Sequence, residues 1–281
     1  RAIIAEQSDR PAAVIPIETV RSGPDALRST LEQRSRDTAY LIVDGETEDD
    51  LATLARAAAP FPLVGGGAGL AAYWPKFPRP PAATPAEDFV PTGGGAGILA
   101  VCGSLTPQSV AQCAAFREAG QPAYRLWPDI VSDPLAGGPP AYRSIAPIAD
   151  RLRQGTDVLV HTPQGVTERA ALRRAAEGRG LSQAETGRSI SSTLAETARC
   201  LREASGLDSL ILLGGDTASA TLRAIGVSGC IIIDEIAPGV PSSCSLDGRF
   251  LLALKSGSFG DGAFLLTAAA HLRRLRRRKA F

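Results

Sequence analysis

The stretch SLILLGGDTASATL, residues 209–222, decides the fold of this chain. Its first five residues, 209–213, are typical of a short buried strand, and residues 218–225 predict a helix. Only the four residues GGDT, 214–217, separate the two. A strand that passes through a glycine turn directly into a helix is typical of a parallel sheet covered by helices.

The same rhythm of strand, turn and helix recurs along the chain. Further strands are predicted at 38–43, 61–64, 98–102, 157–161, 230–234 and 250–255, and further helices at 48–59, 107–119, 187–204 and 261–274. Thr47 and Asp50 form a capping-box pattern at the start of one of these helices. We therefore predict an α/β fold of two domains, each with a mainly parallel sheet flanked by helices, and a ligand cleft between them.

A change of composition marks the boundary between the two domains. Residues 76–97 are rich in Pro, Ala and Gly and show no periodic pattern, which is typical of an interdomain linker. The predicted domains are residues 1–90 and residues 97–281.

Composition excludes several classes of protein. The chain has 281 residues with 30 Lys and Arg against 29 Asp and Glu, so no overall field attracts nucleic acid or an acidic membrane. The five cysteines are scattered and only two histidines are present, which argues against a zinc site or a disulfide framework and predicts no metal held by the protein alone. Apolar runs are shorter than a membrane span, and reduced thiols suit a cytoplasmic protein. The basic run 273–279 is interpreted as the solvated end of a last helix; binding of an anionic partner is the alternative.

The turn in the deciding stretch is a candidate anion site. At the carboxyl end of a parallel strand, Gly214, Gly215, Asp216 and Thr217 would point backbone N–H groups and a helix N-terminus at a ligand. Asp216 could instead orient Mg²⁺ or a hydroxyl group. The alternative is an ordinary tight turn with a helix cap.

Two further turns follow predicted strands in the same way. Ser104 and Thr106 could donate hydrogen bonds to phosphate oxygens, or could simply cap the next helix. Lys255, Ser256 and Gly257 open a loop that could wrap a nucleotide, with Lys255 as the positive charge for a transferring phosphoryl group. The alternative for this loop is a flexible connection.

Other catalytic motifs are absent from the sequence. The glycine cluster 65–69 does not satisfy GxGxxG, so it supports an NAD(P)-dependent oxidoreductase only weakly. GxxxxGK[ST], GxSxG and HExxH do not occur, which argues against a Walker-type kinase, an α/β-hydrolase and a zinc protease.

Taken together and in order, five segments make the chain resemble the four-carbon acid sugar kinase family. GGDTAS at 214–219, EIAPGVP at 235–241 and KSGSFG at 255–260 resemble its nucleotide-domain motifs. VDGET at 43–47 and LVGGGAGL at 63–70 resemble the end of its substrate domain. The resemblance covers nearly the whole chain.

The resemblance implies a kinase that uses ATP and Mg²⁺ to phosphorylate a four-carbon sugar acid, a tetronate, at its terminal hydroxyl. It implies that residues 97–281 hold the nucleotide, through Ser104, the residues 214–217 and Gly257, and that residues 1–90 hold the acid, with Gly66 and Gly67 among the contacts. A cytoplasmic enzyme, and a homodimer as the one protein partner to consider, also fit this family.

The sequence departs from the family pattern at two places. It lacks the Asp-Asp-x-Thr-Gly segment with which the substrate domain opens, so we expect the first half of that domain to be missing and the general base to lie there; no catalytic residue is assigned. Gly67 stands where a serine is expected. Three alternatives remain open: a non-catalytic nucleotide- or metabolite-binding regulator on the same fold, the oxidoreductase, and a nucleic-acid binder that uses the basic run.

Overall fold

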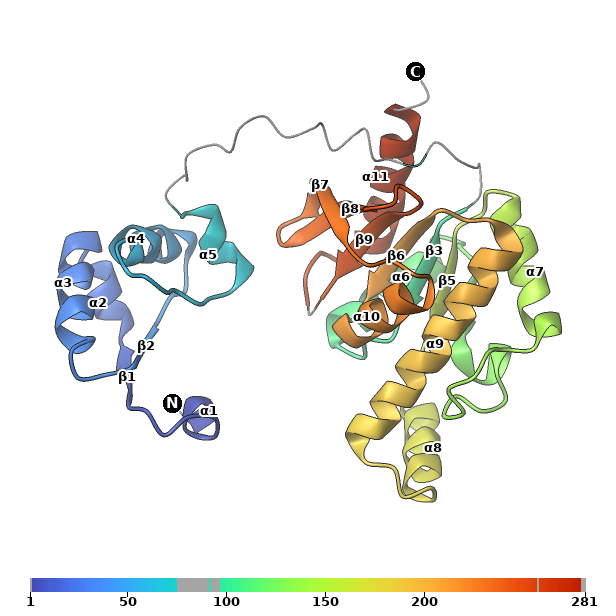
Figure 1. The fold of residues 1–281 in the computed structure, drawn as a ribbon, viewed down its shortest axis with the longest axis horizontal. Helices are drawn as coiled ribbons and strands as arrows, with labels where there is room; N and C mark the ends of the chain where they lie inside the picture. Colours follow the sequence, from blue (N-terminus) through green and yellow to red (C-terminus); the bar gives the residue numbers. More distant parts are fainter. Residues whose placement is uncertain (1, 75–90, 92–96, 257, 279–281) are drawn as a thin grey trace. The chain divides into compact units, whose positions relative to one another are not determined.

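The computed structural model describes residues 2–74, 91, 97–256 and 258–278, and these form two compact units, Arg1–Ala82 and Ala83–Phe281. Figure 1 shows the elements of both. The fold class predicted from the sequence, α/β with mainly parallel sheets flanked by helices, is confirmed. Within the described residues, no helix combines the length and the apolar character that crossing a bilayer requires.

The first unit is built on a two-stranded parallel sheet of β1 and β2. Its elements are α1 (Ala2–Ala5), β1 (Ala12–Ile15), α2 (Ile17–Arg21), α3 (Pro24–Arg34), β2 (Tyr40–Val43), α4 (Glu48–Ala58) and α5 (Ala68–Ala72). A small core of Ile15, Val20, Leu27, Leu31 and Ala57 packs the helices on one face of these strands.

The capping box predicted at the start of α4 is confirmed. The N–H of Asp50 donates to Thr47 Oγ1 at 3.2 Å, and the N–H of Thr47 donates to Asp50 Oδ2 at 2.9 Å. The predicted strand at 61–64 is wrong: the segment is irregular, and Leu63 is 89% exposed where a buried strand residue was expected. Pro62 removes a backbone donor in the middle of the segment, which disfavours pairing with a neighbouring strand.

The second unit carries a seven-stranded sheet in the order β4-β5-β3-β6-β9-β8-β7. Its strands are β3 (Leu99–Cys102), β4 (Ala123–Arg125), β5 (Val158–His161), β6 (Ser209–Leu213), β7 (Cys230–Ala237), β8 (Val240–Ser245) and β9 (Leu251–Lys255). The first five strands in this order, β4, β5, β3, β6 and β9, run parallel to one another. β8 pairs antiparallel with both β9 and β7. The sequence predicted only the first half of β7 and missed β4 and β8.

Helices cover both faces of this sheet. The described helices of this unit are α6 (Pro107–Glu118), α7 (Tyr142–Arg153), α8 (Val166–Glu177), α9 (Gln183–Ser205), α10 (Gly215–Ala224) and α11 (Phe264–Arg278), and a short helical turn, Leu126–Ile130, follows β4. Of these, α7 and α8 were not predicted.

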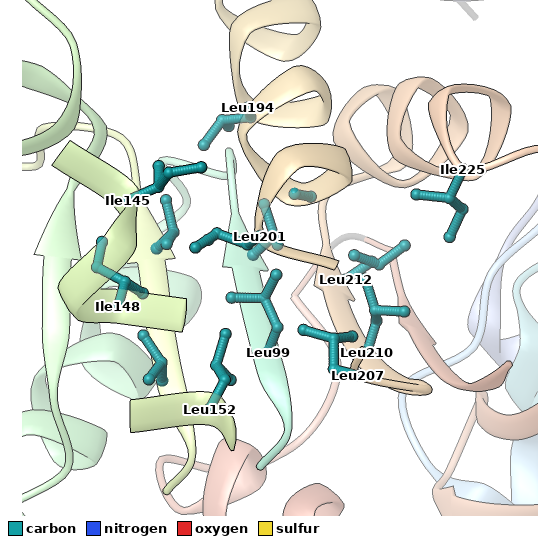
Figure 2. Packing of buried hydrophobic residues seen from close by; sticks show 14 of the residues in the cluster. Leu99, Ile145, Ile148, Leu152, Leu194, Leu201, Leu207, Leu210, Leu212 and Ile225 are labelled. Carbon is teal, nitrogen blue, oxygen red and sulfur yellow. The ribbon is translucent and has the colours of Figure 1, made fainter. Parts of the chain in front are cut away.

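Two hydrophobic cores lie on opposite faces of the sheet because successive strand residues point to opposite sides. Figure 2 shows the first core, where Leu99, Leu210 and Leu212 of the sheet meet residues of α7 and α9 such as Leu152 and Leu201. The second core joins alternate residues of the same strands to α6 and α11. Since both faces are buried, the strands read as continuous apolar runs.

Candidate functional site

Three of the predicted turns meet at one edge of the seven-stranded sheet. Cys102, Leu213 and Lys255 are the last residues of β3, β6 and β9, and they are aligned in register across the three neighbouring strands. The backbone continues this alignment, because the N–H of Gly103 donates to the carbonyl of Leu213 at 3.2 Å and the N–H of Gly214 donates to the carbonyl of Lys255 at 2.9 Å. The turns that follow these strands therefore lie side by side.

The N-terminus of α10 opens at this edge. Gly214 has φ +105°, a conformation that favours glycine, and its carbonyl accepts the first helical hydrogen bond from Ala218 at 2.9 Å. The N–H groups of Gly215, Asp216 and Thr217 precede that bond, so the helix itself gives them no acceptor. Three adjacent donors at the positive end of a helix dipole suit an anion such as phosphate.

Gly103 brings the end of β3 into close contact with α10. A Cβ atom added at Gly103 would lie 2.0 Å from Thr217 Oγ1 and 3.2 Å from Thr217 Cβ. The Thr217 side chain is buried, so it has little room to move away. Glycine at this position therefore fixes the distance between the two turns.

Ser104 and Thr106 occupy the turn between β3 and α6. Thr106 Oγ1 accepts a hydrogen bond from the N–H of Ser109 at 3.3 Å, so Thr106 does cap α6, as one of the two sequence interpretations expected. Ser104 Oγ lies 3.2 Å from Thr106 Oγ1, within hydrogen-bond distance. Both serine and threonine nevertheless line a cavity with the α10 turn.

That cavity has a volume of about 710 Å³ and lies entirely within the second unit. Its size suits a nucleotide, since ligand pockets commonly measure about 300–1,000 Å³. Six of the predicted nucleotide-binding residues line it: Ser104, Thr106, Gly214, Gly215, Asp216 and Thr217. Lys255 and Ser256 do not line it, and Gly257 falls outside the described residues.

Lys255 lies on the other face of the sheet. Its side chain is 2% exposed, and its Nζ donates to Ser109 Oγ in α6 at 3.2 Å. Burial lowers the pKa of Lys255 from its ordinary value, while the nearby thiols of Cys102 and Cys113 act in the opposite direction. Ser256 lies close to the turn at residues 214–217, because a Cβ atom added at Gly215 would lie 3.9 Å from Ser256 Oγ.

Sequence reasoning missed the part of the cavity wall that α8 and α9 supply. The lining residues of α8 include Arg169, Leu172 and Arg173, and those of α9 include Thr186 and Ile190. The helical spacing of Ile190 was visible in the sequence. The sequence of α8 shows no clear apolar face, in agreement with Ala176 being the one buried residue of this helix.

The two predicted substrate contacts line a different cavity, in the first unit. Gly66 and Gly67 border a space of about 370 Å³ together with apolar residues that include Leu41, Val43 and Leu70. A Cβ atom added at Gly66 would lie 3.1 Å from Leu70 Cδ2. The described lining carries no charged side chain, so a sugar carboxylate would find no cation there. A role of these glycines in substrate binding stays a prediction.

Mg²⁺ is implied by the predicted reaction, and the donor set of the cavity is compatible with it. No group of three or more His, Cys, Asp or Glu residues that could hold a metal occurs in the described parts of the chain. Mg²⁺ commonly keeps several waters and binds through one or two carboxylates plus substrate phosphates. Asp216 and Glu177 are the carboxylates that line the cavity, so they are the candidate protein ligands.

The structure weakens two of the alternatives left open by the sequence. The glycine cluster 65–69 does not follow a strand, which the dinucleotide motif requires. In the basic run, Arg273 pairs with Asp157 and Arg276 pairs with Asp208. These two arginines therefore tie α11 to the residues that precede β5 and β6, and each is already paired with a carboxylate of the same unit.

Two domain models of known protein families match separate parts of the chain. A nucleotide-binding C-terminal domain model matches residues 99–265, and a sugar-binding N-terminal domain model matches residues 1–74. The chain is 33% identical to a 3-oxo-tetronate kinase of Pseudomonas fluorescens over 96% of its own length, and 31% identical to one of Cupriavidus necator, also over 96%. In both cases it spans 61% of the relative's length.

A solved structure of a Salmonella typhimurium LT2 protein has the same fold, with a TM-score of 0.63 and 23% identity. That match covers 95% of this chain and 61% of the Salmonella chain.

Proposed function

Because this chain belongs to the four-carbon acid sugar kinase family, we propose that it binds ATP in the cavity at the carboxyl edge of the seven-stranded sheet and serves an ATP-dependent phosphorylation of a four-carbon sugar acid. The acid would be of the 3-oxo-tetronate class named for its relatives, phosphorylated at its terminal hydroxyl. The first unit, residues 1–74 in the match to a sugar-binding domain, would hold the acid.

One observation carries the nucleotide assignment: the N–H groups of Gly215, Asp216 and Thr217 lack acceptors within α10 and border a cavity of about 710 Å³. A phosphate group would accept from these donors at the positive end of the helix. Ser104 on the neighbouring turn would add a hydroxyl donor. Mg²⁺, held by phosphates together with Asp216, would neutralise charge on the phosphates.

Phosphoryl transfer depends mainly on positioning and on stabilising negative charge, and the turns at β3 and β6 are suited to both tasks. Their relative position is fixed by the contact of Gly103 with Thr217, so the donors need little rearrangement when phosphate binds. The residue that takes the proton of the sugar hydroxyl is left unassigned. A cytoplasmic location and assembly as a homodimer belong to the same proposal.

Isothermal titration with a non-hydrolysable ATP analogue, AMP-PNP, in the presence of Mg²⁺ tests the nucleotide site. Gly215→Val should weaken binding at least about tenfold, because a branched side chain would stand beside the donors. Gly138→Val is the matched control, since a Cβ atom there meets nothing within 4 Å and the residue does not line the cavity. Equal affinity of both variants and the unmodified chain would show that the phosphate turn is elsewhere.

The activity itself is tested by a coupled ADP-release assay over a panel of tetronic acids. Turnover of a 3-oxo-tetronate with no ADP release from ATP alone would support the kinase proposal. Binding of AMP-PNP without turnover of any acid would instead favour the regulatory alternative.

A further inference from the structure

Besides the turns after β3 and β6, the wall of the cavity includes one face of α8 and one face of α9. The lining residues of α8 are Arg169, Leu172, Arg173, Ala176 and Glu177, and those of α9 are Gln183, Thr186, Gly187, Ile190 and Ser191. Both sets follow the spacing i, i+3, i+4, i+7, i+8, which places all members of a set on a single helix face. Each helix therefore presents one continuous stripe to the cavity.

The stripe on α8 carries the positive charge of the cavity. Arg169 and Arg173 are the two cationic side chains among its lining residues, and both residues are exposed. Within the described part of the chain, neither guanidinium makes a hydrogen bond or an ion pair. Other arginines of this unit are paired: Arg125 with Glu168 at 2.6 Å, and Arg179 with Asp133 at 2.8 Å.

Thr162 supplies an independent sign that a ligand belongs in this part of the cavity. It follows the last residue of β5, is 3% exposed and lines the cavity. Its Oγ1 is buried and has no hydrogen-bond partner within the described residues. A buried hydroxyl left unpaired is costly, so such a group usually has a partner that is a ligand or a water molecule.

Two hydrogen bonds of Glu168 hold the first turn of α8 in place at the end of β4. Arg125 at the end of β4 binds Glu168, the residue before Arg169, at 2.6 Å. Glu168 also accepts a hydrogen bond from the N–H of Gly165 at 3.2 Å, which caps the helix. The position of the arginine stripe is therefore fixed by the first turn of the helix.

We propose that Arg169 and Arg173 bind the phosphate chain of the nucleotide and supply the positive charge that Lys255 was expected to supply. The proposal rests on the proposed function, since it takes the cavity to be the ATP site. Arginine suits phosphate oxygens because its planar guanidinium offers several N–H donors with a permanent charge. Two guanidinium groups on one wall and the α10 N–H donors on the other would then enclose the phosphate chain.

The test compares AMP-PNP with adenosine, which lacks phosphate. Arg169→Gln and Arg173→Gln should each weaken AMP-PNP binding about tenfold or more, as expected for loss of a charge-assisted hydrogen bond, and leave adenosine affinity within about twofold. Arg174→Gln is the matched control, because it removes the same charge from the next position of α8, outside the cavity lining. Arg173→Lys, which keeps the charge, should retain part of the lost affinity.

The outcomes separate this inference from the function on which it rests. If the unmodified chain binds AMP-PNP but the Arg169 and Arg173 variants bind it as tightly as the Arg174 variant does, the arginine assignment is wrong and the nucleotide site stands. The assignment is equally wrong if adenosine and AMP-PNP lose affinity to the same extent. If the unmodified chain binds neither compound, the proposed nucleotide site is wrong and the inference falls with it.

Discussion

Gly103→Ala should destabilise the second unit, because the end of β3 approaches α10 too closely for any side chain. The new Cβ would lie 2.0 Å from Thr217 Oγ1 and 3.2 Å from both Thr217 Cβ and Leu194 Cδ1. Carbon atoms in favourable contact are about 3.5–4.0 Å apart, so these atoms overlap. Rotation of the Thr217 side chain could remove the first clash, but the two at 3.2 Å would remain.

The cost follows from the usual penalty for overfilling a packed core, about 1–3 kcal/mol. With an m-value of about 2 kcal/mol/M, the urea midpoint of the second unit should fall by roughly 0.5–1.5 M. Trp127 lies in this unit and Trp74 in the first, so Trp127 fluorescence in a Trp74→Phe background follows the relevant transition. AMP-PNP affinity should fall as well, because the N-terminus of α10 must move.

Two further variants test whether this close contact causes the loss of stability. Gly138→Ala adds the same methyl group where nothing lies within 4 Å and should leave the midpoint nearly unchanged. In a Thr217→Ala background, which removes Oγ1, the Gly103→Ala penalty should shrink, since contacting residues are not additive. A Gly103→Ala midpoint equal to that of Gly138→Ala, or a penalty that is undiminished in the Thr217→Ala background, would refute the close-contact reasoning.

Three shorter predictions concern pH and helix stability. The hydrogen bond from Arg21 lowers the pKa of Asp50 to about 2, so the Asp50 carboxylate stabilises the first unit above its ordinary pKa of 3.8, and this contribution is lost as the pH falls through about 2. Asp50→Asn should therefore reduce the dependence of the unfolding free energy of this unit on pH between about 4 and 2, and an unchanged pH profile would contradict the prediction. Burial lowers the pKa of His161, so below pH 6.5 the unfolded chain binds a proton at this residue that the folded chain does not bind, and the free energy of unfolding should fall as the pH drops. His161→Gln should remove this dependence of the unfolding free energy on pH in urea titrations at pH 5 to 7. Gly187 lies within α9 and faces open space, so Gly187→Ala should raise the free energy of unfolding by about 0.5–1 kcal/mol in urea titrations. Gly187→Trp should fill the cavity and weaken AMP-PNP binding, and unchanged AMP-PNP affinity in this variant would contradict the position of α9 as a cavity wall.

The sequence allowed the architecture and the positions of the glycine turns to be predicted for a physical reason. Strands buried on both faces give continuous apolar runs, and the glycine turns that follow them stand out from the helices on either side. Three such turns, at residues 103, 214 and 256, were located correctly at the ends of β3, β6 and β9. Their adjacency follows from the parallel order of these strands.

The elements that sequence reasoning missed lack such contrast. α8 reads VTERAALRRAAE, and it has a single buried residue, so no apolar stripe marks the face toward the core. The face of α8 that lines the cavity carries Arg169, Arg173 and Glu177. Because these residues are charged, a search for the helical repeat of apolar residues does not detect this face. β8 reads VPSSCS and contains a proline, which argues against a strand by composition, yet it pairs with strands on both sides.

The side of the sheet to which a residue points could not be predicted either. Alternation places Lys255 on the same face as Leu251 and Ala253, but both faces of β9 are apolar, so the sequence alone does not distinguish the α6 face from the α9 face. The structure places Lys255 toward α6, where the expected role as a phosphate ligand has no support from the cavity lining.

Lys255 nevertheless connects to the cavity through a chain of hydrogen bonds. Its Nζ donates to Ser109 Oγ at 3.2 Å, Thr106 Oγ1 donates to Ser109 Oγ at 3.0 Å, and Ser104 Oγ lies 3.2 Å from Thr106 Oγ1. A buried ammonium group at one end of this chain fixes Ser109 as an acceptor, and so orients the Thr106 hydroxyl toward it. The Ser104 hydroxyl is then held at the rim of the cavity. Lys255 is therefore placed to position Ser104, the serine proposed to bind phosphate, and the proposed direct charge on the phosphates comes from Arg169 and Arg173 in the cavity lining.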